Sequence, residues 1–251
     1  MLTYGVAVLA RPTFDVPFAE ATKERAFAAL EAAGIRTVGP RGLLFDRAAA
    51  EQAVAEIAAA GPIDLLLILQ VTFTDATMTV KLARESKVPL AVWALPEPRI
   101  GGRLRLNAYC GLNLAAHALG RAGVPHGSLY ADPEAPGIGE SLRALARAHA
   151  IPASSAKAPA VAAAVAADAA AARVLGALAD SKITVVGRHP DGFDTCEYDP
   201  ALLARLTGMR VDQVELPELF ARARATDPAR VAAVRERVAV SYTHLTLPTK
   251  A

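Results

Sequence analysis

The sequence predicts an α/β protein in which a doubly wound parallel sheet forms the first domain and a second, incomplete α/β unit follows it. Short apolar segments alternate along the chain with segments of helical character, which is typical of strand–helix–strand units. Most of these apolar segments are hydrophobic at consecutive positions and lack a two-residue alternation. That pattern is expected of parallel strands that are covered on both faces.

The first domain is predicted over residues 1–150, because five apolar segments fall there. They are YGVAVLA (4–10), IRTVGP (35–40), IDLLLILQ (63–70), PLAVWAL (89–95) and GSLYAD (127–132). Helices are expected in the intervals between them. For the first helix, Asp15 is a suitable N-cap, Pro17 suits the first turn, and Gly34 is a natural stop.

The second unit is predicted over residues 151–239. A segment with Pro and Ser leads into an alanine-rich helix, and two further strands are expected, KITVVG (182–187) and MRVDQVEL (209–216). Helices are expected over 201–208, 216–225 and 227–239. Because a two-stranded sheet is only marginally stable by itself, we predict that this unit is truncated.

Composition limits the classes of partner. The chain has 251 residues, 53% of them hydrophobic, and a net charge of +2 with no basic block. We therefore expect neither nucleic acid nor a membrane as a partner. The two cysteines are far apart in sequence, which favours a reducing compartment, and the apolar run near the amino terminus lacks a basic leader. We predict a cytoplasmic protein.

The position of a binding site follows from topology. Open α/β sheets bind ligands beyond the carboxyl ends of their strands, at the point where the strand order reverses. For a flavodoxin-like order 2-1-3-4-5, residues 11–15 and 72–75 would face each other across a crevice. The polar loops 96–113 and 188–199 also follow predicted strands.

Each candidate has a structural alternative. Thr74 or Asp75 could cap the next helix, and Phe73 could belong to the core. The arginines of PRIGGRLR (98–105) could bind an anion or lie solvated. The sequence contains no complete dinucleotide fingerprint, no Walker lysine, no serine-nucleophile motif and no metal-ligand spacing.

Four long segments resemble the L-fucose/L-arabinose isomerase superfamily, in particular its fucose-isomerase-like branch. They are VLARPTFDVPFAEA, ILQVTFTDATMTVKLA, PLAVWALPEPRIGGRLRLNAYCGLNLAAHALGR and VVGRHPDGFDTCEYDPALL. The resemblance covers residues 1 to about 239. It implies a homo-oligomeric, metal-dependent aldose–ketose isomerase, usually with Mn²⁺.

In that family the metal ligands come from the end of the second domain and from a third domain, and they have no counterpart here. The resemblance therefore implies an amino-terminal fragment that is inactive alone and binds no metal itself. It assigns this chain to one side of the pocket for a small neutral sugar. The implied substrate-binding residues are Arg11, Phe14, Thr72, Phe73, Asp75, Asn107, Cys110, Asn113, Phe193, Asp194 and Cys196.

Two other functions stay open at this point. The chain could be a non-catalytic sugar-binding module whose two α/β units close on a ligand. It could also come from a related isomerase for a modified, acidic hexose, with Arg99, Arg103 and Arg105 binding the acidic group.

The last twelve residues, 240–251, differ in composition from the helices before them. VSYTHLTL could form a short edge strand, because it is rich in β-branched residues and alternates. However, a reverse translation of residues 240–249 is similar to a transposon adapter used to prepare sequencing libraries. We therefore expect this tail to be translated adapter read-through with no evolved role.

Overall fold

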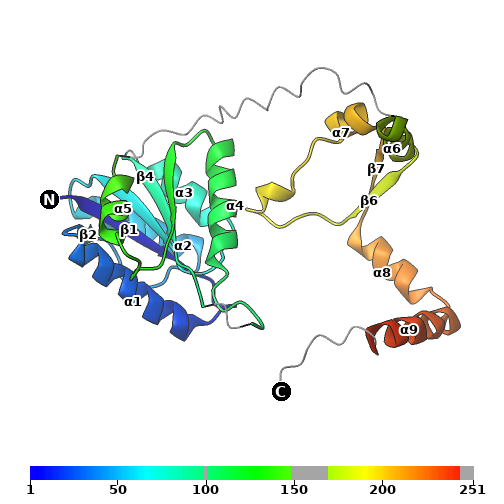
Figure 1. Ribbon diagram of the computed structural model, residues 1–251, viewed down its shortest axis with the longest axis horizontal. Helices are drawn as coiled ribbons and strands as arrows, with labels where there is room; N and C mark the ends of the chain where they lie inside the picture. The colour runs from blue at the N-terminus through cyan, green and yellow to red at the C-terminus, as the bar shows by residue number, and fades with distance from the viewer. Residues whose placement is uncertain (87, 99–100, 148–168, 244–251) are drawn as a thin grey trace. The chain divides into compact units, whose positions relative to one another are not determined.

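The computed structural model describes residues 1–86, 88–98, 101–147 and 169–243. Its first five strands form one parallel sheet in the order β2-β1-β3-β4-β5 (Figure 1). The bounds are β1 Thr3–Leu9, β2 Arg36–Val38, β3 Leu65–Gln70, β4 Leu90–Ala94 and β5 His126–Tyr130. All five strands and their order confirm the prediction of a doubly wound α/β fold.

Five helices cover the two faces of this sheet. Their bounds are α1 Val16–Ala32, α2 Arg47–Ala59, α3 Thr77–Glu85, α4 Ala108–Arg121 and α5 Ile138–Leu145. Helices α1 and α5 contribute to one apolar core, and α2, α3 and α4 contribute to the core on the opposite face. The sheet therefore lies between two helical layers.

Strand β3 shows why its sequence has no alternation. Leu65, Leu67 and Leu69 point into the core beneath α1 and α5, whereas Leu66 and Ile68 point into the core beneath α2, α3 and α4. Each of these side chains is buried. Because successive residues of a strand face opposite sides, burial on both faces requires apolar residues at every position.

The first helix begins and ends where its sequence predicts. The carboxylate of Asp15 accepts a hydrogen bond from the backbone N–H of Phe18 at 3.0 Å, and Pro17 lies in the first turn. Gly34 follows the helix with a φ of +71°, a conformation that glycine adopts without steric cost. Local sequence thus sets both ends of α1.

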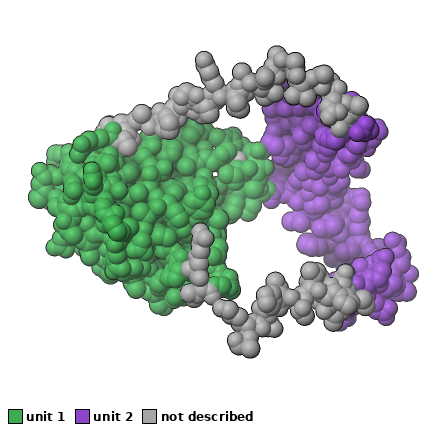
Figure 2. All heavy atoms as spheres, in the orientation of Figure 1, with its two compact units in different colours: residues 1–163, 189–197 green, residues 164–188, 198–251 purple. Residues whose placement is uncertain are grey.

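The remaining elements belong mainly to a second compact unit, drawn in purple in Figure 2. Their bounds are α6 Ala169–Ala179, β6 Lys182–Val186, η1 Asp194–Cys196, α7 Pro200–Thr207, β7 Arg210–Val214, α8 Leu216–Arg224 and α9 Pro228–Thr243. Strands β6 and β7 pair in parallel as a two-stranded sheet. Residues 189–197, which include η1, are instead part of the first unit.

The second unit has little apolar core among its described residues. Helices α7 and α8 bury no side chain, and Leu206, Leu216 and Phe220 are exposed. The truncation of this unit stays a prediction.

Helix α9 continues through Thr243, so the first four residues of the tail are helical and not extended. The other tail residues, 244–251, lie outside the described part of the chain. Within the described helices, no segment combines the length and apolarity that a membrane crossing would need.

Candidate functional site

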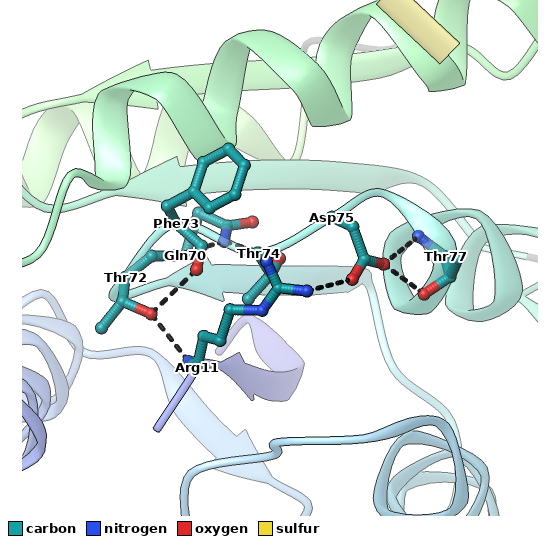
Figure 3. Close-up of polar contacts among 7 residues, drawn as sticks. All are labelled: Arg11, Gln70, Thr72, Phe73, Thr74, Asp75 and Thr77. Carbon is teal, nitrogen blue, oxygen red and sulfur yellow. Dashed lines mark hydrogen bonds and ion pairs between the residues drawn. The ribbon is translucent and has the colours of Figure 1, made fainter. Parts of the chain in front are cut away.

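Two loops meet beyond the carboxyl ends of β1 and β3, where the strand order reverses (Figure 3). The backbone N–H of Arg11 donates to the hydroxyl oxygen of Thr72 at 2.8 Å. The guanidinium of Arg11 forms an ion pair with the carboxylate of Asp75 at 3.0 Å. These contacts show that the two loops face each other, as the predicted strand order requires.

Asp75 has two structural roles. One carboxylate oxygen binds Arg11, and the other accepts the backbone N–H of Thr77 at 3.0 Å together with the hydroxyl of Thr77. The N-cap position of α3 is Ala76, which has no side-chain capping bond, so neither Thr74 nor Asp75 is the N-cap that the sequence predicted. Asp75 lies one residue earlier and binds the first residue of the helix, and its ion pair with Arg11 ties that helix to the end of β1.

Gln70 binds the loop of residues 72–75 through its side-chain amide. This residue ends β3 and is buried, and its Nε2 donates to the carbonyl oxygen of Thr72 at 2.6 Å and to the hydroxyl of Thr74 at 3.0 Å. Its Oε1 is buried and has no protein partner within the described residues. A Cβ atom at Gly111 would lie 2.9 Å from Nε2, so a glycine is needed where α4 crosses this side chain. The amide therefore holds the loop in one conformation.

Three phenylalanines form a row along the crevice. The ring centroids of Phe14 and Phe73 are 6.2 Å apart, and those of Phe73 and Phe193 are 5.8 Å apart, with tilted planes. All three side chains are half-buried. Phe73 and Phe193 also pack against Leu114 and Ala118 of α4. Phe73 is thus both a packing residue and one edge of the crevice surface.

The segment 189–197 lies directly on the amino-terminal end of α3. The carbonyl oxygen of Gly192 accepts the backbone N–H of Ala76 at 3.1 Å. Gly192 has a φ of +78°, and a Cβ atom there would lie 3.0 Å from the carboxylate of Asp75. At the other end of the segment, Glu197 pairs with Arg121 of α4. Gly192 is therefore required both by its backbone conformation and by the close approach.

The loop between β4 and α4 is fixed by one carboxylate. Glu97 accepts the backbone N–H of Leu106 at 3.1 Å and that of Asn107 at 2.7 Å, and also that of Arg105. The carbonyl oxygen of Leu106 in turn accepts the backbone N–H of Phe73 at 2.8 Å. This loop is consequently held against the crevice by backbone hydrogen bonds.

The arginines of this loop differ in their partners. Arg105 donates to Asp15 at 2.8 Å, and its guanidinium lies 3.8 Å from the ring centroid of Phe18. The hydrogen bond from Phe18 N–H, together with Arg105, lowers the pKa of the Asp15 carboxyl. Arg103 instead donates to a neutral acceptor, the carbonyl oxygen of Thr13, at 3.3 Å.

The charge of Arg103 consequently has no carboxylate partner in the described part of the chain. It borders a cavity of about 330 Å³. The lining residues are Thr13, Phe14, Asp15, Arg103, Leu104 and Arg105. Arg99, the third arginine considered from the sequence, lies outside the described residues.

The other predicted site residues lie on or next to α4 and η1. Asn107 immediately precedes α4, and the side chains of Cys110 and Asn113 are exposed on that helix. Cys196 is exposed on η1. The thiols of Cys110 and Cys196 form no disulfide. The side chain of Asp194 lies outside the described part of the structure.

The chemistry of the assembled groups is that of binding. The hydroxyls of Thr72 and Thr74 are buried and hydrogen-bonded within the protein. The more accessible groups are the guanidinium of Arg11, the amide of Asn113 and the half-buried phenylalanine rings, which suit a small polar ligand. Across the described residues, no three His, Cys, Asp or Glu side chains are arranged to hold a metal ion.

Sequence reasoning missed Gln70 and Glu97. A glutamine that ends an otherwise apolar strand was a usable signal, because buried amides need partners. It also missed Tyr109 and Tyr130, whose rings are paired with centroids 4.9 Å apart. These two tyrosines are separated by a whole helix in sequence, and no local pattern connects them.

Comparison with known proteins shows the family of the chain. The sequence model described as "Fucose/sulfoquinovose isomerase, N-terminal domain" matches residues 5–169. The chain is similar to the sulfoquinovose isomerase of Priestia aryabhattai, with 27% identity over 212 residues, which is 84% of this chain and 42% of the relative. A sulfoquinovose isomerase of Alkalicoccus urumqiensis is 28% identical over 166 residues, which is 65% of this chain and 32% of the relative. The sulfoquinovose isomerase of a Clostridium species is 26% identical over 227 residues, which is 89% of this chain and 45% of the relative. The chain thus spans less than half the length of these curated relatives.

Proposed function

The chain belongs to the fucose/sulfoquinovose isomerase family through the amino-terminal domain of that family, and we propose that it is the amino-terminal part of an aldose–ketose sugar isomerase. The family match over residues 5–169 is the observation that carries this proposal. The matched region contains the crevice formed by the ends of β1 and β3, with its polar and aromatic side chains.

We propose that this chain binds and orients the sugar and that the proton transfer is carried out elsewhere in the parent protein. Aldose–ketose isomerisation moves a proton between adjacent carbons, which requires a base beside the carbon and stabilisation of the charge on oxygen. The described residues offer the guanidinium of Arg11, the exposed amide of Asn113 and aromatic faces, which suit the recognition of a polyol. These groups favour a role in positioning.

A divalent metal such as Mn²⁺ belongs to the same proposal, in an intact, homo-oligomeric parent. When bound, such a metal polarises sugar oxygens as a Lewis acid. Its ligands would come from parts of the parent outside the described residues, because the residues described here do not fit one. On this basis the 251-residue chain should show no isomerase activity by itself.

We further propose an acidic sugar as substrate, in place of the neutral sugar expected from the resemblance. The relatives are named sulfoquinovose isomerases, and sulfoquinovose is an acidic sugar. Arg103 supports the proposal, because its guanidinium borders a cavity and binds only a carbonyl oxygen within the described residues. Arg105 is less suitable, because Asp15 already neutralises its charge.

A chimera tests the proposed function. The aligned amino-terminal segment of the Priestia aryabhattai enzyme would be replaced by this chain, and conversion of sulfoquinovose would be measured with Mn²⁺ present. We expect turnover by the chimera and none by this chain alone. A folded chimera without activity, or turnover by the chain alone, would contradict the proposal.

The substrate class is tested in the same chimera. Arg103→Ala should raise KM for sulfoquinovose by roughly tenfold, since it removes a charge-assisted hydrogen bond. It should change KM for glucose, a neutral aldohexose, little. Arg36→Ala is the matched control, because Arg36 is exposed on β2 far from the strand ends that form the crevice. An equal effect of Arg103→Ala on both sugars would exclude a role in binding the acidic group.

A further inference from the structure

A pair of exposed tyrosine rings lies at the same edge of the sheet as the crevice, apart from the residues that form the crevice itself. Tyr109 is in the first turn of α4, and Tyr130 ends β5. Their ring centroids are 4.9 Å apart with an angle of 56° between the planes. The residues are 51% and 45% exposed, so both rings present apolar surface to solvent.

Topology places this pair beside the crevice. Gln70 pairs with Ala94, and Ala94 pairs with Tyr130, so the end of β5 is two strands from the end of β3. Two strand spacings amount to about 10 Å. The tyrosines therefore border the same open edge of the sheet as the crevice loops.

The turn before Tyr109 is held in an uncommon conformation. Asn107 has a φ of +53° and is the only non-glycine residue with positive φ among the described residues. Its side chain does not cap α4, so helix capping does not account for the conformation. Glu97 holds the turn by accepting the backbone N–H of Asn107 at 2.7 Å. Uncommon backbone held by surrounding contacts is found preferentially at binding sites, where it fixes the position of a side chain.

Polar groups that could bind hydroxyls lie next to the rings. Asn113 follows Tyr109 by one helical turn, so both side chains are on one face of α4, and Asn113 is exposed. Aromatic faces pack against the C–H groups of a sugar ring, and amides bind its hydroxyls. The face therefore has the two kinds of group that a sugar needs.

A protein partner fits this face less well. Apart from Tyr109, the exposed face of α4 includes Asn113 and His117, which are polar. A stable protein interface buries about 800 Å² on each partner around an apolar centre, and two rings supply only a fraction of that area.

We infer that Tyr109 and Tyr130 form a stacking surface for the ring of the sugar substrate. This inference rests on the proposed function and adds a binding surface that recognises the carbon face of the ring. It predicts that the two tyrosines act on acidic and neutral sugars alike, whereas Arg103 acts on the acidic one.

Binding to the full 251-residue chain tests the inference. Sulfoquinovose and glucose would be titrated, with saturation-transfer NMR reporting contact between sugar C–H groups and tyrosine rings. Tyr109→Ala and Tyr130→Ala should each weaken the binding of both sugars by about three- to tenfold, the range expected for one aromatic contact. Tyr109→Phe should bind as the wild type does, because it keeps the ring.

Tyr198→Ala is the matched control, since Tyr198 is 49% exposed in the second unit. Circular dichroism melting would verify that each variant is folded. Wild-type affinity in Tyr109→Ala and Tyr130→Ala, or no saturable sugar binding by the wild-type chain, would overturn the inference. So would a change of sedimentation coefficient in these variants, which would identify a protein interface. In each of these cases, activity of the chimera would show that the proposed function holds although the stacking surface does not.

Discussion

Replacing Gln70 by leucine tests whether this buried amide fixes the crevice loop. The substitution removes both hydrogen bonds donated by Nε2 and leaves the carbonyl oxygen of Thr72 and the hydroxyl of Thr74 without that donor. Leaving two buried acceptors unsatisfied costs about 2–4 kcal/mol. The substitution also removes Oε1, which is buried and has no protein partner within the described residues, and this stabilises the folded state by about 1–2 kcal/mol.

Taking the middle of each range, the net loss of unfolding free energy is about 1.5 kcal/mol, which should lower the melting temperature by roughly 3–6 °C. Thermal melting followed by circular dichroism measures this change. Gln52→Leu is the matched control, because Gln52 is exposed on α2 and its amide binds only Glu56, at 2.9 Å. If Gln70→Leu melts together with the wild type and the control, the hydrogen bonds of Gln70 do not hold the loop.

Gln70→Glu sharpens the test, because it keeps the shape of the side chain and lacks a hydrogen-bond donor once the carboxyl is ionised. Burial should raise the pKa of the new carboxyl in the folded state above its unfolded value of about 4.3. The folded state then favours the protonated form. Stability should be retained below pH 4.3 and lost progressively as pH rises above it. If the melting temperature of this variant follows that of the wild type across this pH range, residue 70 does not need to be a buried hydrogen-bond donor.

Three further perturbations have defined outcomes. Phe73→Ala should weaken sulfoquinovose binding more than stability, because the ring is half-buried; a collapsed melting temperature with unchanged affinity would make it a core residue. Asp15→Asn keeps the cap and removes the charge. Since the pKa of Asp15 is lowered in the fold, the stability gap to wild type should be present at pH 7 and shrink as pH falls below about 4; a gap independent of pH would contradict this. Deletion of residues 240–251 should leave solubility and melting temperature unchanged, because the described part of α9 before them buries no side chain; a fall of several degrees would show that they pack.

The sequence by itself determined the layered fold of the first unit. Apolar residues at every position of β3 predict a strand that is covered on both faces, and Asp15, Pro17 and Gly34 predict the limits of α1. These features depend on interactions within a few residues, so they can be recognised without knowing the rest of the fold. The strand order then predicted that the loops carrying Arg11 and Asp75 would meet.

Only the tertiary structure decided which side chains meet across long distances in sequence. Gln70 contacts the loop that follows it while α4 approaches it at Gly111, and the row of rings brings Phe73 together with Phe193. Packing likewise paired Arg105 with Asp15 and left Arg103 beside a cavity, although the two arginines are nearly adjacent in the chain. Sequence patterns record the local preference of each residue. The partner of a buried amide, a ring or a charge depends instead on how whole helices and loops pack, and that packing is a property of the complete fold.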